Sequence, residues 1–261
     1  MRKIIWLLIL IILLILGFFI YQKYQKQKIW QAQPNTSWQW QLSGEIDTSF
    51  NVEMYDIDLF DTDMAIINNL QKRGIKVICY FSAGSYEDWR PDQDKFPKEL
   101  LGKKMQDWDE LWLDISNLKL LAPIMIARLN LAKDKGCDGV EPDNVDGYQN
   151  NTGFNLTSKE QLAYNKFLAK EAHKRGLSIG LKNDLDQIKE LVEYFDWALN
   201  EQCFEYDECK KLLPFIKANK AVFGVEYELS PNQFCKKANK LDFDWLFKNY
   251  DLDSFRESCR N

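Results

Sequence analysis

Three carboxylates and an amide lie in the segment Gly139–Gly147, whose sequence is Gly-Val-Glu-Pro-Asp-Asn-Val-Asp-Gly. The acids are Glu141, Asp143 and Asp146, and they follow a short apolar run. Hydrolysis of a glycosidic bond needs two carboxyls on opposite sides of the anomeric carbon: one protonates the leaving oxygen, and the other attacks the carbon or activates water. If this segment supplies one of the two, the second must come from another part of the chain.

Elements able to position such acids recur along the chain from residue 37 onward. Short β-rich runs alternate with helical patterns in which apolar residues recur at three- and four-residue spacing. The eight predicted strands are Trp38–Leu42, Met54–Phe60, Lys76–Ser82, Glu110–Ile115, Gly139–Asp143, Ser178–Asn183, Trp197–Cys203 and Ala221–Tyr227. Strands that alternate with helices predict a parallel sheet, and this number of strands closes a (β/α)8 TIM barrel, for which about 225 residues suffice. A doubly wound open sheet is the alternative, but no Gly-rich phosphate loop follows an early strand.

Local signals indicate where particular helices begin. Thr157 and Glu160 form a capping-box pattern that opens one helix. Pro123 is expected in the first turn of the helix between the fourth and fifth strands, where a proline is tolerated. The first connection, residues 43–53, is expected to be irregular.

The side chains at the carboxyl ends of barrel strands face the active site. The predicted strand ends carry acids, amides, aromatic rings and a single lysine, a set that suits the binding of sugar hydroxyls and stacking on sugar rings. It lacks the several basic groups expected around phosphates. The residues that we expect to contact substrate are Trp40, Asp58, Tyr80, Ser82, Asp114, Glu141, Asp146, Lys182, Asn183, Asn200 and Glu226.

Asp143 and Glu201 are the best pair for the two-carboxyl chemistry. Each ends a predicted strand, and these strands, the fifth and the seventh, lie two apart around the barrel. Glu141 shares the face of Asp143, because alternate residues of a strand point the same way. Asp146 lies past the strand and is expected in a substrate-binding loop, while Lys182 is expected to pair with a carboxylate.

The composition excludes several other classes of function. A net charge of −5 and a pI near 5.2 argue against a nucleic-acid partner. The single histidine, His173, lies among charged residues of a predicted helix and is expected to be solvated. Catalysis by a Ser-His pair or a His-ligated metal is therefore not expected, and no cofactor is predicted.

The N-terminus predicts a membrane anchor. Arg2 and Lys3 precede an unbroken apolar run, Ile4–Ile20, which as a helix would span about 25 Å. No small-residue cleavage site closes the run, which favours an uncleaved signal anchor over a removed signal peptide. We expect an anchor over residues 1–24, a polar linker over 25–36 and a single catalytic domain over 37–261 outside the cytoplasm.

The six cysteines are consistent with export. No C-x-x-C pair occurs, so the sequence contains no zinc-ribbon or thioredoxin-like motif. Cys203 with Cys209, and Cys235 with Cys259, could form two bridges. The remaining two, at positions 79 and 137, are expected to be small buried core residues.

Four stretches together resemble glycoside hydrolase family 114, the endo-α-1,4-polygalactosaminidases and their barrel relatives. They are Trp38–Leu42, Val77–Gly84, Gly136–Asn144 and Asn200–Cys203. The similarity covers roughly residues 36–255 and keeps both the order and the spacing of the motifs. It implies a (β/α)8 barrel, export or membrane anchoring, and endo-cleavage of α-1,4-linked galactosamine-rich polysaccharide.

Carried over by motif position, the catalytic carboxylates of that family fall on Asp143 and Glu201. We expect a retaining mechanism with Asp143 as nucleophile and Glu201 as acid/base, although the reverse roles are open. The resemblance also implies substrate binding by Tyr80, Asp58, Lys182, Asn183 and Asn200. Two alternatives stay open: a carbohydrate-binding barrel without catalysis, and a metal-dependent lyase or hydrolase with Glu141, Asp143 and Asp146 as oxygen ligands.

Overall fold

The structure is a computed structural model that describes residues 29–260. The predicted membrane anchor, residues 1–24, and the first part of the predicted linker lie outside the described residues. Between residues 29 and 260, no helix has the length and apolar character needed to cross a membrane.

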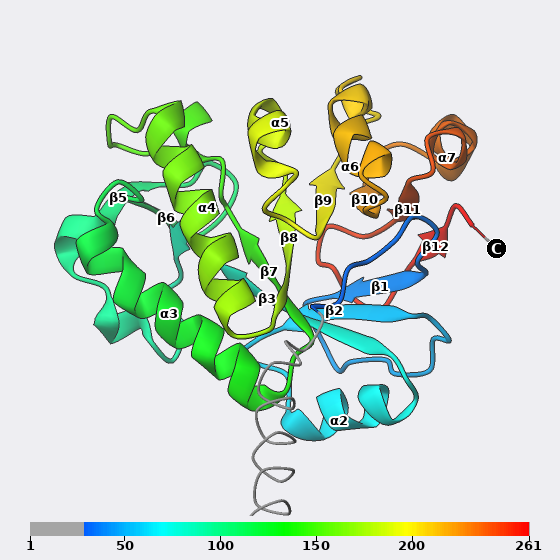
Figure 1. The fold of residues 1–261 in the computed structure, drawn as a ribbon, viewed down its shortest axis with the longest axis horizontal. Coiled ribbons are helices and arrows are strands. Elements are labelled where there is room, and N and C mark those ends of the chain that lie inside the picture. The colour runs from blue at the N-terminus through cyan, green and yellow to red at the C-terminus, as the bar shows by residue number, and fades with distance from the viewer. Residues whose placement is uncertain (1–28, 261) are drawn as a thin grey trace, which may run out of the picture.

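A curled sheet of mostly parallel strands forms the centre of the molecule (Figure 1). In the order in which they pair, its strands are β1 Trp38–Gln41, β2 Met54–Asp58, β3 Lys76–Ser82, β7 Gly139–Asp143, β8 Ser178–Lys182, β9 Trp197–Glu201, β10 Val222–Glu226, β11 Asp244–Phe247 and β12 Glu257–Ser258. Neighbours pair in parallel except β12, which is antiparallel to β11. The prediction of an α/β fold around a parallel sheet is confirmed, and the fold is barrel-like.

Side chains and loops connect the two ends of this sheet. Within residues 29–260, β1 has a backbone ladder with β2 alone. Trp38 Nε1 donates a 2.9 Å hydrogen bond to the carbonyl oxygen of Asp244, which begins β11. At the opposite end of β1, Leu42 N donates to Leu252 O at 2.9 Å. These contacts bring the first and last parallel strands together across the opening.

Helices follow most strands and cover the outside of the sheet (Figure 1). They are α2 Met64–Lys72, α3 Leu118–Lys135, α4 Ser158–Lys174, α5 Ile188–Leu191, α6 Leu213–Lys217 and α7 Pro231–Lys240, with 3-10 turns η1 Gln93–Lys95, η2 Lys98–Leu100, η3 Gly147–Gln149, η4 Leu185–Gln187 and η5 Cys209–Leu212. The predicted capping box of Thr157 and Glu160 is present at the start of α4. Residues 43–53 contain no helix, as predicted. The prediction for Pro123 was wrong: it is the sixth residue of α3, so its ring lies in the second turn, where a missing N–H leaves one helical hydrogen bond unmade.

One predicted barrel strand belongs to a separate small sheet. The run Glu110–Ile115 contains β6, Leu111–Leu113, which pairs antiparallel with β4, Ser85–Tyr86, and β5, Leu101–Lys104. The eighth parallel strand is instead β11, which the sequence pattern missed. The number of parallel strands was therefore right, but the fourth predicted strand was assigned to the wrong sheet.

Large aromatic side chains fill the interior of the curled sheet below its carboxyl ends. The buried cluster there contains Ala32, Trp38, Trp40, Met54, Ile78, Trp197, Leu199, Ala221, Phe223, Val225, Tyr227 and Leu246. A Cβ on Gly180 would lie 2.2 Å from the ring of Trp197, so the ring occupies the space that any larger residue would need. Ala32 joins this floor, and its carbonyl accepts a 2.9 Å hydrogen bond from Ala221 N, so the described end of the predicted linker packs on the domain.

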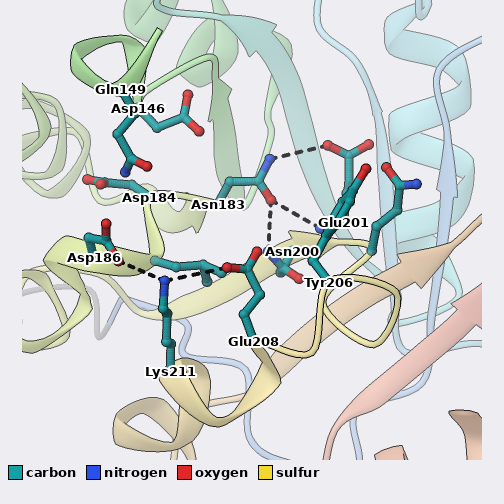
Figure 2. Close-up of a pocket in the computed structure, with 12 residues that line it drawn as sticks. Asp146, Gln149, Asn183, Asp184, Asp186, Asn200, Glu201, Tyr206, Glu208 and Lys211 are labelled. Atoms are coloured by element: carbon teal, nitrogen blue, oxygen red, sulfur yellow. Dashed lines mark hydrogen bonds and ion pairs between the residues drawn. The ribbon is translucent and has the colours of Figure 1, made fainter.

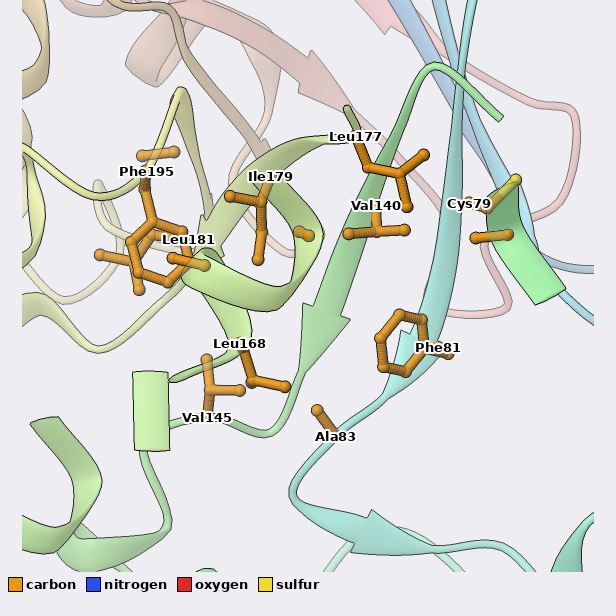
Figure 3. Close-up of a cluster of buried hydrophobic side chains, with 14 of the residues drawn as sticks. Cys79, Phe81, Ala83, Val140, Val145, Leu168, Leu177, Ile179, Leu181 and Phe195 are labelled. Carbon is orange, nitrogen blue, oxygen red and sulfur yellow. The ribbon is translucent and has the colours of Figure 1, made fainter. Parts of the chain in front are cut away.

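A second apolar layer lies between the sheet and the helices (Figure 3). Phe81, Val140 and Leu181 extend outward from adjacent strands and pack with Leu168 of α4. Burying several such side chains, at about 1.5–3 kcal/mol each, holds the strands in the register that brings their polar ends together.

Three disulfides bridge all six cysteines. Two of them, Cys203–Cys209 and Cys235–Cys259, are the predicted pairs. The prediction for Cys79 and Cys137 was wrong: both are buried, as expected, but they are bonded to each other with Cα atoms 6.1 Å apart. Because β3 and β7 are neighbours in the sheet, residues far apart in sequence face each other here. Three bridges favour an oxidising compartment, and hence a domain outside the cytoplasm.

Candidate active site

The ammonium of Lys182 joins three carboxylates at the carboxyl ends of adjacent strands. Its Nζ lies 3.0 Å from Asp143 Oδ1, 3.2 Å from Glu201 Oε2 and 3.4 Å from Glu141 Oε1. Burial alone would lower the pKa of Lys182, but the surrounding carboxylates of Asp143, Glu201 and Glu141 raise it well above its ordinary value. The lysine is therefore a permanently charged centre of the site, in the carboxylate-pairing position that the sequence predicts.

The strand order explains this arrangement. Asp143 ends β7, Lys182 ends β8 and Glu201 ends β9, and these three strands are consecutive in the sheet. Parallel strands end on the same edge, so the three side chains meet there. The expected separation of the two acids by one intervening strand is present.

Each of the two acids accepts further hydrogen bonds that orient it. Tyr80 Oη donates to Asp143 Oδ2 at 3.2 Å, and Asn144 N donates to Asp143 Oδ1 at 2.7 Å. On the other acid, Tyr227 Oη donates to Glu201 Oε1 at 2.5 Å. The side chains of Asp143 and Glu201 are 17% and 27% exposed, so both reach solvent while their inner oxygens are held.

Two amides extend the network around Glu201 (Figure 2). Asn183 Nδ2 donates to Glu201 Oε2 at 3.3 Å, and its Oδ1 accepts 3.0 and 3.1 Å bonds from Glu201 N and Asn200 Nδ2. Asn183 has a positive φ of 49°, a conformation that asparagine tolerates and that directs its side chain toward this acid. The sequence predicted both amides in the site, and the structure brings both next to Glu201.

A polar cavity of about 250 Å³ lies beside Glu201 (Figure 2). Its lining residues are polar or charged with one exception, and they are Asp146, Gln149, Asn183, Asp184, Leu185, Asp186, Asn200, Glu201, Gln202, Tyr206, Glu208 and Lys211. Burial, followed by the charge of Asp143, raises the pKa of Asp146 to about 6. Burial, followed by the charge of Asp146, raises the pKa of Asp184 to about 8. The cavity is thus rich in hydrogen-bonding groups. Because two of its acids have raised pKa values, it carries fewer full negative charges than the number of its acidic side chains.

A second layer of acidic side chains lies beneath the two exposed acids. Asp56 on β2 and Glu141 on β7 are fully buried, and burial raises the pKa of each well above its ordinary value. The Lys182 ammonium lies 4.9 Å from the ring centroid of Trp40, whose π-face adds to its stabilisation. Trp40 and Glu141 therefore contact the lysine from below.

Four predicted site residues are engaged elsewhere. Asp58 forms a buried 2.8 Å ion pair with Arg90. Asp114 accepts hydrogen bonds from the backbone and hydroxyl of its neighbour at position 116, because its run belongs to the small sheet. Glu226 points outward and accepts from the backbone of residue 204 at 3.0 Å. Ser82 is buried and accepts a 2.9 Å bond from Asn144 Nδ2, so it supports the loop after β7.

His173 lies outside the site. Its side chain is 31% exposed, and its Nε2 lies 2.9 Å from Asp196 Oδ2, so it is half-buried and paired where the sequence predicted a solvated residue. In residues 29–260, no group of three or more His, Cys, Asp or Glu side chains is placed to hold a metal ion.

The pattern of strand ends missed three residues of this site. Tyr227 directly follows β10 and donates a hydrogen bond to Glu201. Asp56 lies two residues before the end of β2. The third, Asp184, sits at a positive φ of 41° just after β8. The alternation of side chains along the strands indicates Asp56, because it is in register with Trp40 of β1 and points to the same, inner face of the sheet.

A family model and several solved structures are similar to this chain. The model of glycoside-hydrolase family GH114 matches residues 21–261. The crystal structure of Ega3 from Aspergillus fumigatus, solved in complex with galactosamine, has a TM-score of 0.84 and 45% identity, and the alignment covers 88% of this chain and 97% of Ega3. The glycoside hydrolase domain of PelA from Pseudomonas aeruginosa has a TM-score of 0.67 at 14% identity, over 85% of this chain and 98% of that domain, and so shares the fold.

A comparison with curated proteins gives no match. The family model covers most of the chain, including every residue of the carboxylate and lysine cluster. The chain belongs to glycoside-hydrolase family GH114.

Proposed function

We propose that this protein hydrolyses α-1,4-linked galactosamine-rich polysaccharide by endo-cleavage, with Asp143 and Glu201 as its catalytic carboxyls. The observation that carries the proposal is the pair itself: two partly exposed acids at the ends of β7 and β9, fixed by Lys182 between them and bordered by a polar cavity. The galactosamine bound by Ega3, which is 45% identical, supports the sugar class.

A retaining mechanism suits the spacing of the pair. Since one ammonium lies 3.0 Å from Asp143 Oδ1 and 3.2 Å from Glu201 Oε2, these oxygens can be no more than about 6 Å apart. Retaining enzymes place their carboxyls about 5–5.5 Å apart, and inverting enzymes about 6.5–9.5 Å apart. The short approach of these two oxygens to one ammonium favours the closer, retaining arrangement.

The surroundings of the two acids support distinct roles. Glu201 lines the cavity and is the more exposed acid, so it can exchange its proton with water in every cycle, as an acid/base must. It would protonate the glycosidic oxygen while Asp143 attacks the anomeric carbon and forms a glycosyl-enzyme. Water would then attack the same carbon with Glu201 as general base, which releases the sugar and restores both acids.

The acids and rings around the pair suit an extended cationic polymer. Asp146 lines the cavity, where its carboxylate could pair with an amino group of the sugar. Tyr206 and Tyr250 are 63% and 48% exposed on the Glu201 side of the site, and they offer flat faces for pyranose rings. A chain bound across this surface would be cut internally.

We infer a (β/α)8 barrel domain over residues 37–261, tethered to the membrane by the apolar run Ile4–Ile20 through residues 25–36. The three disulfides support a position outside the cytoplasm.

Product analysis tests the function. The purified protein is incubated with deacetylated α-1,4-galactosamine polymer, and the products are sized over time and their anomeric configuration is followed by NMR. Oligomers of intermediate length that appear early with the α-configuration retained would support the proposal. Release of monomer alone would contradict endo-action, inversion would contradict the roles above, and cleavage of only the fully N-acetylated polymer would contradict the substrate.

A further inference from the structure

A second cavity adjoins the one beside Glu201. It has a volume of about 430 Å³, and its lining includes Tyr148, Leu162, Asp186 and Glu190. This volume lies within the range of about 300–1,000 Å³ that is usual for small-molecule sites. Asp186 lines both cavities, so they meet at its side chain. Figure 2 shows Asp186 and Glu201 at opposite sides of the first cavity, so the second cavity continues the first on the side away from Glu201.

A hydrogen bond also joins the walls of the two cavities. Gln149 lines the first cavity and Tyr148 lines the second. Gln149 Nε2 donates to Tyr148 Oη at 3.0 Å. The half-buried phenol of Tyr148 therefore borders the junction, with its hydroxyl held by a residue of the first cavity.

The loop that carries Tyr148 is fixed to α4. Tyr148 N donates to Gln161 Oε1 at 3.4 Å, and Asn165 Nδ2 donates to Val145 O at 3.0 Å. Gln161 and Asn165 are both fully buried side chains of α4. A ring that is already held in place loses little conformational freedom when a ligand stacks on it. Tyr148 is therefore a preorganised aromatic surface.

Each cavity has a buried amide oxygen in its lining that lacks a donor. Gln187 lines the second cavity, and its Nε2 donates to Ser158 O at 2.6 Å, which fixes the orientation of the amide. Among residues 29–260, no donor reaches Gln187 Oε1 or, in the lining of the first cavity, Asn200 Oδ1. Buried acceptors without donors are destabilising. The two linings are thus short of donors, which the hydroxyl and amino groups of a sugar supply.

The junction of the cavities is acidic. Asp186 has a 55% exposed side chain, and its Oδ1 lies 2.8 Å from Lys211 Nζ. An ion pair between two such exposed groups is weak, so the carboxylate remains available to a ligand ammonium. Glu190 adds a second acid to the lining of the second cavity, against one base, Lys159. This balance of charge favours an amino sugar over an anionic ligand.

We propose that the second cavity is a distal subsite of the polysaccharide cleft. Tyr148 stacks on a pyranose ring there, and Asp186 pairs with the amino group of a hexosamine residue of the chain that is cut beside Glu201. The inference rests on the proposed function above. Tyr206, which is 63% exposed, lines the first cavity near Glu201 (Figure 2), so aromatic side chains border both sides of that cavity. A chain held on both sides of the two acids is cut at an internal bond.

The dependence of kcat/KM on chain length tests the subsite. Purified α-1,4-galactosamine oligomers of increasing length are cleaved by wild type and by Tyr148→Ala. The variant should lose about twofold to tenfold in kcat/KM on oligomers long enough to reach the second cavity, and nothing on the shortest oligomers that are cleaved. Tyr148→Phe retains the ring and should match wild type. Tyr194 is exposed and lines neither cavity, so Tyr194→Ala is the matched control and should match wild type at every length.

A second variant tests the recognition of the amino group. The exposure of Asp186 lets Asp186→Asn fold normally, which keeps the test valid if Tyr148→Ala does not fold. Asp186→Asn should lower kcat/KM about twofold to fivefold on long deacetylated oligomers and leave it unchanged on long oligomers that are N-acetylated at the distal residues. An equal loss on both substrates would contradict a pairing with the amino group.

The outcomes for the subsite and for the proposed function are distinct. If wild type cleaves the polymer and both variants match it at every length, the function stands and the subsite is wrong. A loss of equal size on short and long oligomers would also contradict a distal site. If wild type cleaves no polymer, the proposed function fails, and calorimetric binding of the same oligomers still decides: weaker binding of only the long oligomers by Tyr148→Ala supports the subsite, and equal binding by variant and wild type overturns it.

Discussion

Tyr227 Oη donates a 2.5 Å hydrogen bond to Glu201 Oε1, and the ring of Tyr250 stacks on Tyr227 with centroids 4.3 Å apart. Tyr227 thus holds Glu201 in position, and the half-exposed ring of Tyr250 holds Tyr227 in position. The stack links the chemistry at Glu201 to the surface over which a polymer would lie. It also connects β9, β10 and the segment after β11, which are far apart in sequence.

Loss of the Tyr227 hydroxyl should slow the chemical step. Tyr227→Phe retains the stacked ring but leaves Glu201 without its donor, and a hydrogen bond to a charged group contributes about 1.5–3 kcal/mol. We expect kcat to fall roughly tenfold to a hundredfold with little change in KM. Steady-state kinetics on the galactosamine polymer give both values, and an unchanged kcat would show that this contact does not act on the reaction.

Loss of the Tyr250 ring should weaken binding of long substrates. Tyr250→Ala removes a flat surface worth about 0.5–1.5 kcal/mol in stacking, so KM should rise by up to about tenfold on polymer. Tyr250→Phe should retain near-wild-type KM. Tyr194, also exposed but on the outer surface, where Lys166 lies over its ring, is the matched control, and Tyr194→Ala should leave KM unchanged. Equal effects of the two alanine variants would argue against a stacking site.

The buried acid Asp184 should make stability depend on pH. Burial raises its pKa from 3.8 to about 8, so the folded protein holds a proton that the unfolded chain releases above about pH 4. This contribution to stability is full below pH 4 and is lost as the pH rises through about 8. Asp184→Asn should therefore flatten the fall of the melting temperature between these values. Parallel curves for variant and wild type would contradict the assignment.

The bridge between Cys79 and Cys137 should contribute most to stability among the three. It closes a loop with a sequence separation of 58, against 6 for Cys203–Cys209. In the chain-entropy description, such a loop corresponds to about 4 kcal/mol. Urea unfolding of the Cys79→Ala, Cys137→Ala double variant should show a loss of that order, and the variant that lacks Cys203–Cys209 should lose less. The reverse ranking would be inconsistent with this account.

Most of the site was predictable from the sequence, because strand ends in a parallel sheet meet on one edge. Asp143, Glu201, Lys182 and the amide at position 183 follow directly from that rule. The rule failed for the run Glu110–Ile115, whose alternating apolar residues have the same local pattern as a barrel strand but pair with an insertion after β3.

Other features depend on contacts that no local pattern contains. Asp58 ends β2 as predicted, yet Arg90, from the inserted segment, takes its carboxylate. Cys79 and Cys137 read as core residues because both are apolar in context, and only the adjacency of β3 and β7 brings them together. Tyr227 and Glu226 are neighbours that point to opposite faces, and the prediction assigned to the site the acid, which faces outward.

Turnover of the two acid variants tests the central claim most directly. The kcat of wild type, Asp143→Asn and Glu201→Gln is measured on deacetylated α-1,4-galactosamine polymer, with the surface variant Asp251→Asn as control. Removing either catalytic carboxyl of a two-carboxyl glycosidase should lower kcat at least about a thousandfold, while the control matches wild type. If either variant retains turnover within about tenfold of wild type, that carboxyl is not catalytic and the account is wrong.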